Sequence, residues 1–343
     1  MATRTLLDRI SPLSLGFGIS LLLIASLFAS ETLLGRWDLL LVAGDFDPLA
    51  RVSTGILRDL RISIVHCLLA GYLPAALLQV LRNSRRTVAR LQGALDCTPE
   101  ECETFAGSIR LSKLGMLAAT LIGFAIAFLP PLFVEPVPDR PWDPAGWNAE
   151  VAWHRVLGPV TGIGLALLVY AVTSVSLRMS RIAHRLSRID LLDLTPLAPF
   201  AQQGLSNALL LVGVLSVASL MMLETGFIKL MMFIGSCTLV FAVLALLAPV
   251  RGVQKRVRGA KQEELAWIAD QISGLRARYA EPQPGARSGE LADMVAYRTL
   301  IEHVPEWPFT GSTYLRLFVY ALIPLASWSV GIVAEELIGR LFF

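Results

Sequence analysis

Charged residues are scarce in this chain, and the residues that most often carry out chemistry are scarcer still. Only 17% of the 343 residues are charged, and there are four histidines and four cysteines. No pair of histidines has the spacing of a metal site, and no glycine-rich phosphate loop or nucleophile elbow occurs. The sequence therefore predicts that the protein is not an enzyme and holds no metal and no cofactor.

Hydrophobic residues make up 55% of the chain and occur in long uninterrupted runs. A segment that crosses a bilayer must satisfy its own backbone hydrogen bonds, and an α-helix of about 20 residues does so. We therefore predict an all-α, polytopic membrane protein with seven transmembrane helices. The predicted spans cover residues 13–34, 62–81, 114–134, 156–177, 205–223, 227–248 and 315–334.

The distribution of basic residues predicts the orientation of these spans, because Lys and Arg resist translocation. The N-terminal segment and the segments after spans two, four and six hold 21 Lys and Arg residues, against 8 in the alternating segments. The sequence thus predicts a cytoplasmic N-terminus and an external C-terminus. Arg outnumbers Lys by 26 to 4, as in a GC-rich bacterial genome. We therefore expect a multi-pass protein of the bacterial inner membrane, with the lipid bilayer as its partner.

The net charge of +3 follows from this loop bias and does not indicate a nucleic-acid partner, since no compact basic patch is interleaved with aromatic residues. Cys67 and Cys237 lie inside predicted spans, where a thiol packs as a small apolar group. Cys97 and Cys102 lie in a loop on the predicted cytoplasmic side, which is a reducing compartment. We expect structural thiols at these positions and no metal site.

A short string recurs ahead of spans one, three and five, and it indicates an internal repeat. It reads LLDRISPL from Leu6, ALDCTPEE from Ala94 and LLDLTPLA from Leu191. Related basic strings precede the last two copies, LRNSRRTVARL from Leu81 and LRMSRIAHRL from Leu177, about 96 residues apart. The Asp, Ser or Thr, and Pro residues equally fit ordinary helix starts. Two interpretations stay open: simple helix caps, or three related hairpins formed by spans one to six.

We divide the chain into a six-helix transmembrane body at residues 1–249, a cytoplasmic helical stalk at 250–312, and the seventh span with an external C-terminus at 313–343. In the stalk, apolar residues continue the helix of span six at steps of three and four, as in a helical bundle or coiled coil. The seam is broken once, at Lys261. This apolar seam predicts contacts that join subunits into a homo-oligomer. The assembly candidates are Leu265, Ile268, Ile272 and Leu275.

Few polar residues within or beside the first six spans are notable. His66 and Gln79 lie in span two, and Glu224 and Lys229 lie at the turn between spans five and six. We favour structural roles for His66, Glu224 and Lys229. No span carries a central acid or a ladder of arginines, which argues against carboxylate-based proton pumping and against voltage sensing.

Span seven carries the most suggestive pattern in the chain. Polar and small residues recur there at steps of four, three, four and four, which places them on one helical face. Pro324 also frees the carbonyl of Tyr320 and predicts a kink at mid-membrane. Such a stripe can line an aqueous path, while close helix packing is the favoured interpretation for Gly331. The pore-lining candidates are Tyr320, Pro324, Ser327, Gly331 and Glu335.

In topology the chain resembles the seven-helix ion channel superfamily of insect odorant and gustatory receptors. Thr313 and Tyr314 resemble the Thr-Tyr signature of that family, although the downstream Gln is absent. The resemblance implies four subunits joined by cytoplasmic helices around a cation pore that the last helix lines. The closing strings, EWPF from Glu306 and IPLASW from Ile323, also look like those of uncharacterised bacterial integral membrane proteins.

These patterns lead to one main hypothesis and two alternatives. The main hypothesis is a homo-oligomeric inner-membrane ion channel, with span seven lining the pore and the cytoplasmic helices joining the subunits. The first alternative is a transporter built from repeated hairpins, with a site between spans two, four and seven. The second alternative is a sensor or scaffold that transports nothing and signals through its cytoplasmic helices.

Overall fold

The computed structural model describes residues 11–33, 55–98, 100–101, 104, 107, 110–128, 149–187, 189–223, 228–280, 289–307, 315, 319 and 322. This part of the chain is helical apart from turns and loops, so the predicted all-α class is confirmed for it. The helices are α2 (Pro12–Leu33), α4 (Gly55–Arg90), α6 (Lys113–Ile126), α8 (Ala149–Ile182), α9 (Ala198–Ala218), α10 (Ile228–Ala280) and α11 (Gly289–Glu302). Short 3₁₀ turns lie at Ala183–Arg185, Thr195–Leu197 and Ser219–Leu223.

Five helices in the described part of the chain are long and apolar enough to cross a membrane. They correspond to predicted spans one, two, four, five and six, and the chain is therefore consistent with a multi-pass membrane protein. At the place of predicted span three, α6 has 14 residues, which is shorter than the roughly 20 that a crossing needs. Predicted span seven lies mostly outside the described residues. The count of seven therefore stays a prediction.

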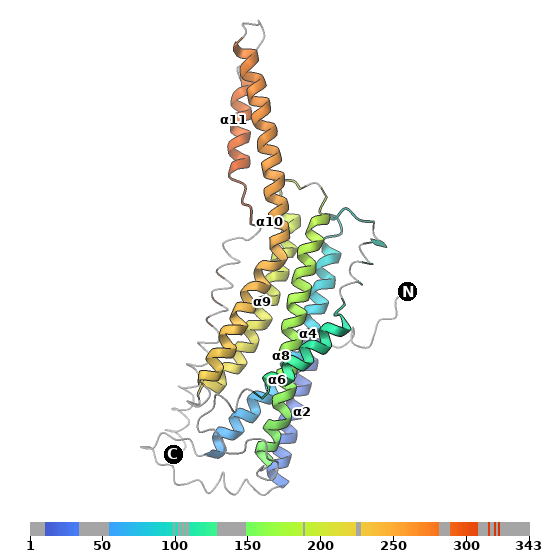
Figure 1. Ribbon diagram of the computed structural model, residues 1–343, viewed down its shortest axis with the longest axis vertical. Coiled ribbons are helices and arrows are strands. Elements are labelled where there is room, and N and C mark those ends of the chain that lie inside the picture. The colour runs from blue at the N-terminus through green and yellow to red at the C-terminus, as the bar shows by residue number, and fades with distance from the viewer. Residues whose placement is uncertain are drawn as a thin grey trace, which may run out of the picture.

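Four helices form the centre of the bundle. α4 packs on α8, α8 on α10, α10 on α9, and α9 on α4, which closes a ring (Figure 1). α2 packs on α4, and α6 packs on α8. α2 and α6 expose large apolar side chains such as Leu13 and Leu114, at 85% and 77%, as helices that face lipid do. α2 and α6 therefore present apolar faces outward.

The predicted hairpins correspond to pairs of helices that pack on each other: α2 with α4, α6 with α8, and α9 with α10. Each pair has a glycine where the two backbones approach closely. A side chain at Gly71 would collide with the carbonyl of Gly16, one at Gly123 with the carbonyl of Gly162, and one at Gly204 with the backbone of α10. Small residues allow such contacts between helices in membranes. Each pair thus packs as a hairpin, and the relation of the three pairs as a repeat stays a prediction.

The recurring Asp, Ser or Thr, and Pro strings also act as helix starts. Ser11 Oγ accepts a hydrogen bond from the backbone N–H three residues later (3.1 Å). Thr98 and Glu101 form a reciprocal pair, in which Thr98 N–H donates to Glu101 Oε2 (2.9 Å) and Glu101 N–H donates to Thr98 Oγ1 (3.3 Å). Asp193 Oδ1 accepts from the N–H of Thr195 (3.0 Å). The capping interpretation is therefore confirmed for the strings at Ser11 and Thr98, whereas Asp193 closes a turn ahead of Thr195–Leu197 and α9, neither of which has a side-chain cap.

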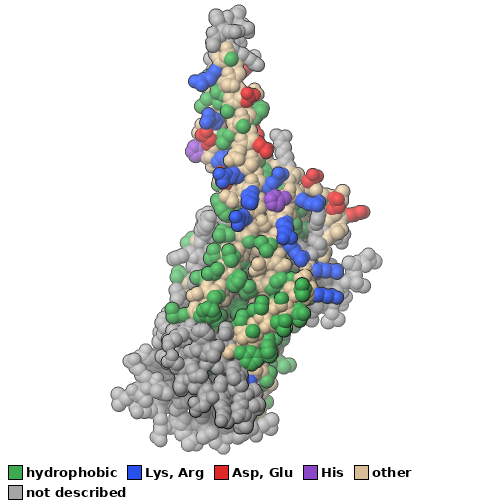
Figure 2. Space-filling view, in the orientation of Figure 1, with side chains coloured by type: hydrophobic (Ala, Val, Ile, Leu, Met, Phe, Trp, Pro, Cys, Tyr) green, Lys and Arg blue, Asp and Glu red, His purple; other side chains and the backbone are tan. Residues whose placement is uncertain are grey.

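α10 is the longest element and continues out of the bundle as one arm of the stalk, with α11 packed against it (Figure 1). Its 53 residues correspond to a rod of about 80 Å. The domain boundary predicted at residue 250 thus falls inside an unbroken helix. Figure 2 shows hydrophobic side chains over the bundle and Lys and Arg side chains where the stalk joins it. We call this junction the basic end.

Candidate functional site

The five pore-lining candidates in span seven lie outside the described residues. Three other residues of that segment are described, namely Leu315, Val319 and Leu322. All three are helical, and they are 64%, 49% and 43% exposed. Their steps of four and three place them on one face of a helix. These three side chains therefore form an exposed apolar stripe.

The assembly candidates lie on α10 within the stalk, and their helical seam is confirmed. Ile268 is fully buried, and Leu265 and Ile272 are partly buried against the same apolar cluster, to which Ile301 of α11 also belongs. Leu275 is partly exposed. The seam is therefore filled inside the chain by α11, and its role in joining subunits stays a prediction.

A chain of uncharged polar side chains crosses the interior of the four-helix ring. Thr87 of α4 donates its hydroxyl to Gln203 Oε1 of α9 (2.8 Å), and Gln203 Nε2 donates to Asn207 Oδ1 (2.8 Å). Asn207 Nδ2 donates to Ser176 Oγ of α8 (3.2 Å), which in turn donates to the carbonyl of Ala245 in α10 (3.4 Å). The four side chains are buried. This polar network therefore links all four central helices.

Pro249 explains why the network ends at α10. Proline has no N–H, so the carbonyl of Ala245, four residues earlier, lacks its usual helical donor. An unpaired carbonyl costs several kcal/mol in an apolar environment. The Ser176 hydroxyl supplies the missing donor, and Asn207 supplies a donor to Ser176 in turn. The network thus compensates for a proline inside a membrane-crossing helix.

A second, separate set of side-chain hydrogen bonds joins α4 to α9 only. Gln79 Nε2 donates to Asn83 Oδ1 (3.0 Å), and Asn83 Nδ2 donates to Ser206 Oγ (2.7 Å). Sequence inspection singled out Gln79 and missed its partners. The signal was nevertheless present, because Ser206 and Asn207 lie three and four residues after Gln203 and therefore share its helical face.

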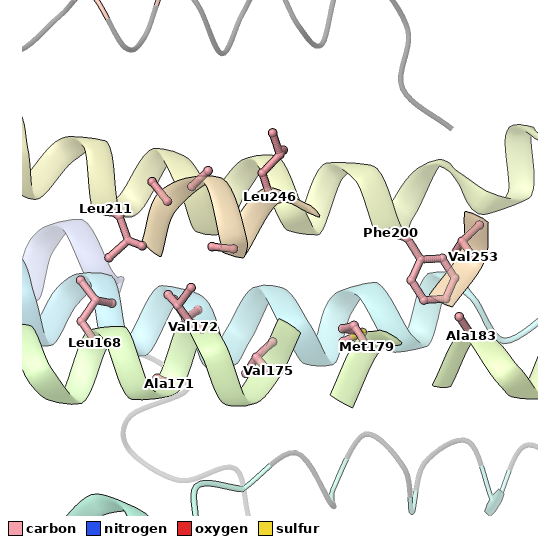
Figure 3. Close-up of a cluster of buried hydrophobic side chains, with 14 of the residues drawn as sticks. Leu168, Ala171, Val172, Val175, Met179, Ala183, Phe200, Leu211, Leu246 and Val253 are labelled. Carbon is pink, nitrogen blue, oxygen red and sulfur yellow. The ribbon is translucent and has the colours of Figure 1, made fainter. Parts of the chain in front are cut away.

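Apolar side chains surround the network along the length of the ring. On α8, Leu168, Val172 and Val175 line the face that meets α9 and α10 (Figure 3). Leu211 of α9 lies beside Leu168 and Val172 in this view, and all four of these side chains are at most 1% exposed. Interiors of this kind are close-packed. The ring is therefore a packed core that positions the helices.

The chemistry of the network is limited by its members, which are hydroxyls and carboxamides. Neither group is a general acid or base near neutral pH, so the network does not relay protons through carboxylates or imidazoles. Among the described residues, no cluster of three or more His, Cys, Asp or Glu is placed to hold a metal ion. What the network does in the described helices is join the four central helices by hydrogen bonds.

At the basic end, the loops that follow α4 and α8 pair with each other. Leu95 and Leu186 form the antiparallel bridge, and the N–H of Asp96 donates to the carbonyl of Arg185 (2.9 Å). Arg256 of α10 donates its Nη2 to the carbonyl of Leu186 (2.9 Å). A third basic string, VRGVQKRVRG, occupies the corresponding place in α10. The ends of the three hairpins are therefore joined in one structure.

No family model, curated protein or solved structure matches this chain. The resemblance to insect receptor channels therefore rests on predicted topology and stays a prediction. The function has to be argued from the geometry of the described residues themselves.

Cys97, in the loop that follows α4, forms a disulfide, so the expectation of a free thiol there is wrong. Cys67 is a buried free thiol and Cys237 an exposed one. A disulfide sulfur is not a thiolate, so Cys97 does not bind metal in this state. A disulfide at the basic end also contrasts with the reducing compartment that the basic residues predict on that side.

Proposed function

We propose that this chain is a subunit of a homo-oligomeric complex of the bacterial inner membrane, joined through its cytoplasmic stalk. The observation that carries the proposal is the exposure of Trp267 and Leu300 on the stalk, at 50% and 52%. Trp267 lies 16 residues beyond Arg251 on α10, about 24 Å along the helix. It is therefore outside the apolar layer of a bilayer, and exposed aromatic side chains in water are typical of protein interfaces.

Trp267 and Leu300 fall on the same side of the stalk. Trp267 directly precedes the buried Ile268 on α10, and Leu300 directly precedes the buried Ile301 on α11. Successive residues turn by about 100° around a helix, and the two helices run in opposite directions. The residue before each buried position therefore projects to the same side of the hairpin. Trp267 and Leu300 are therefore apolar side chains exposed on the same side of the stalk.

This side of the stalk differs from the seam that the sequence pattern predicts for assembly. The seam residues hold α11 against α10 and so make the stalk rigid. A rigid hairpin loses little conformational entropy on association, which favours binding through its outer side. We therefore assign the contact between subunits to the side of Trp267 and Leu300, with the seam supporting it from within.

The oligomeric state of the purified full-length protein tests the proposal. Wild-type protein is expected to elute as an oligomer in size-exclusion chromatography with light scattering, and Trp267→Arg is expected to elute as a monomer. Val295→Arg is the matched control, because Val295 is 48% exposed and follows Met294, which packs on the seam, so it projects to the other side. A monomeric wild-type protein, or equal dissociation of both variants, would refute the proposal.

Ion conduction through this complex is the second candidate function, and the apolar stripe of span seven favours it. In an ideal helix that starts at Leu315, the stripe of Leu315, Val319 and Leu322 lies about 150° from the centre of the predicted polar stripe. A polar stripe opposite an apolar stripe is the pattern of a helix that faces lipid on one side and a pore on the other.

Ion flux into proteoliposomes tests conduction directly. Ser327→Trp places a large side chain on the polar stripe and is expected to abolish flux. Val319→Trp places the same side chain on the exposed apolar stripe and is expected to leave flux intact. Flux that survives Ser327→Trp, or no flux in the wild-type protein, favours a scaffold that transports nothing.

The transporter alternative receives less support from the described helices. It requires a site between spans two, four and seven, and spans two and four correspond to α4 and α8. These helices meet directly, and a side chain at Gly164 of α8 would press against Leu73 of α4. This interface is an apolar contact.

A further inference from the structure

α8 and α10 run in the same direction and touch at the basic end (Figure 1). The contact is closest at Gly252, where a side chain would collide with the carbonyl of Ser180. The position of the charged residues around this contact follows from helical geometry. In two parallel helices, the residue after the contact position on one helix and the residue before it on the other project to the same side.

Arg181 and Arg251 are those two residues, and both are exposed. Lys255 follows Arg251 by about one turn on the same side of α10 and is exposed, and His184, in the 3₁₀ turn directly after α8, is exposed as well. Figure 2 shows Lys, Arg and His side chains gathered at this level of the molecule. Arg181, Arg251 and Lys255 therefore form one cationic surface on two neighbouring helices, and His184 lies beside it.

The same side of both helices is apolar in the turns that lead up to the cationic surface. Leu177 of α8 is 50% exposed, and Leu244 and Leu247 of α10 are 53% and 37% exposed. Leu177 and Leu247 each lie four residues before an arginine of the surface, which is about 6 Å along the helix. The exposed side chains thus change from apolar to cationic within about one turn of each helix. A bilayer changes from acyl chains to phosphates over a similarly short distance.

Among the described residues, no ion pair joins Arg181, Arg251 or Lys255 to an acidic side chain, whereas Arg185 lies near Glu101. The carboxylate of Glu101 lies close enough to Arg185 for that cation to help lower its pKa, after the larger effect of the hydrogen bonds from Thr98. We therefore leave Arg185 out of the surface. Arginine binds phosphate through a planar pair of N–H donors, and Lys adds a further point charge.

We propose that the cationic surface of α8 and α10 binds the phosphates of anionic phospholipids in the cytoplasmic leaflet. The apolar side chains directly below it would contact the acyl chains of the same lipid molecules. That continuity favours a lipid headgroup over a soluble anion. The inference concerns the bundle and is independent of assembly through the stalk.

Lipid titration of the full-length protein in detergent tests this inference, with bound lipid counted by native mass spectrometry. Phosphatidylglycerol is the probe, phosphatidylcholine is the neutral control, and sn-glycerol 1-phosphate is the soluble anion. We expect wild-type protein to prefer phosphatidylglycerol. The combined substitution Arg181→Gln, Arg251→Gln and Lys255→Gln is expected to weaken its binding by up to about 100-fold, since each surface cation contributes about fivefold.

Two further variants separate the effect of this surface from general charge and from folding. Arg276→Gln removes one exposed cation of the same helix about 38 Å farther along the stalk, and it is expected to bind lipid as the wild type does. Arg181→Lys combined with Arg251→Lys keeps the charge and is expected to keep the lipid preference. Equal binding of the two lipids, or unchanged binding by the triple variant, would overturn the inference. Effective competition by sn-glycerol 1-phosphate would identify a soluble-anion site instead.

Discussion

The ammonium group of Lys261 on α10 lies 2.9 Å from the carbonyl oxygen of Val304, directly after α11. The same group lies 2.7 Å from the carbonyl of Glu302, the last residue of α11. The last carbonyls of a helix lack helical donors and carry a partial negative charge, so a cation stabilises them. Lys261 interrupts the apolar seam of α10 but binds these carbonyls. It thereby joins the C-terminal end of α11 to α10.

Lys261→Met is expected to release the end of α11 from α10, because Met keeps the apolar stem of Lys and donates no hydrogen bond. The loss of two charge-assisted bonds from a partly exposed group corresponds to roughly 1–2 kcal/mol. Hydrogen–deuterium exchange of the amides of α11 measures the effect. Arg276→Met on the exposed side of the same helix is the control. Equal exchange in both variants would show that the hydrogen bonds of Lys261 do not hold α11 against α10.

Asn207→Leu is expected to destabilise the bundle by about 1–3 kcal/mol, because it leaves Gln203 Nε2 without an acceptor and Ser176 Oγ without a donor in a buried apolar setting. Thermal unfolding in detergent measures the change. Ser216→Ala is the matched control on α9, since the Ser216 hydroxyl bonds only to its own helix at Val212 (3.0 Å), and its removal is expected to be nearly neutral. A neutral Asn207→Leu would show that the network contributes nothing to stability.

Gly71→Val is expected to separate α2 from α4, because the new side chain would collide with Gly16 and Ser20. Gly18→Val is the control on α2, where nothing lies within 4 Å of the added carbon. Both changes replace Gly by the same β-branched residue within a helix, so intrinsic propensity is matched. Monodispersity in detergent and trypsin resistance are expected to fall for Gly71→Val alone.

Acidification is expected to loosen the helix start that follows Thr98. Hydrogen bonds from the backbone and side chain of Thr98, in that order of importance, lower the pKa of Glu101, with a smaller contribution from Arg185. A lowered pKa in the folded state means that this stabilisation is present above the ordinary pKa of Glu and is lost as the pH falls through the folded pKa. Carboxyl NMR of ¹³C-labelled Glu follows the titration, and Thr98→Val is expected to raise the pKa of Glu101. An unchanged pKa in that variant would contradict the capping pair.

Cys97 offers a test of orientation, because the basic residues predict that it lies on the cytoplasmic side. After reduction of the disulfide, a membrane-impermeant maleimide is expected to label Cys97 in inside-out vesicles and not in intact cells from which the outer membrane has been removed. Cys97→Ser supplies the background labelling of the other cysteines. Labelling from the outside would reverse the predicted orientation.

Much of the helical framework could be predicted from the sequence. The apolar runs located five helices that are long and apolar enough to cross a membrane, and the strings at Ser11 and Thr98 located helix starts, because both signals are local. The partners of the helices could not be predicted in this way. The seam through Ile268 correctly indicates a packed helix, but periodicity does not distinguish a second subunit from α11 of the same chain.

The sequence by itself determined that this protein is helical and apolar enough for several membrane crossings, because a bilayer requires each segment to satisfy its own hydrogen bonds. It also determined that cations gather at one end, since charge is read directly from composition. Only the tertiary structure decided what the isolated polar residues do. Ser176 donates a hydrogen bond to the carbonyl that Pro249 leaves without a helical donor, and Lys261 donates hydrogen bonds to the carbonyls at the end of α11. Donor and acceptor in each pair lie more than 40 residues apart, so packing of the helices brings them together.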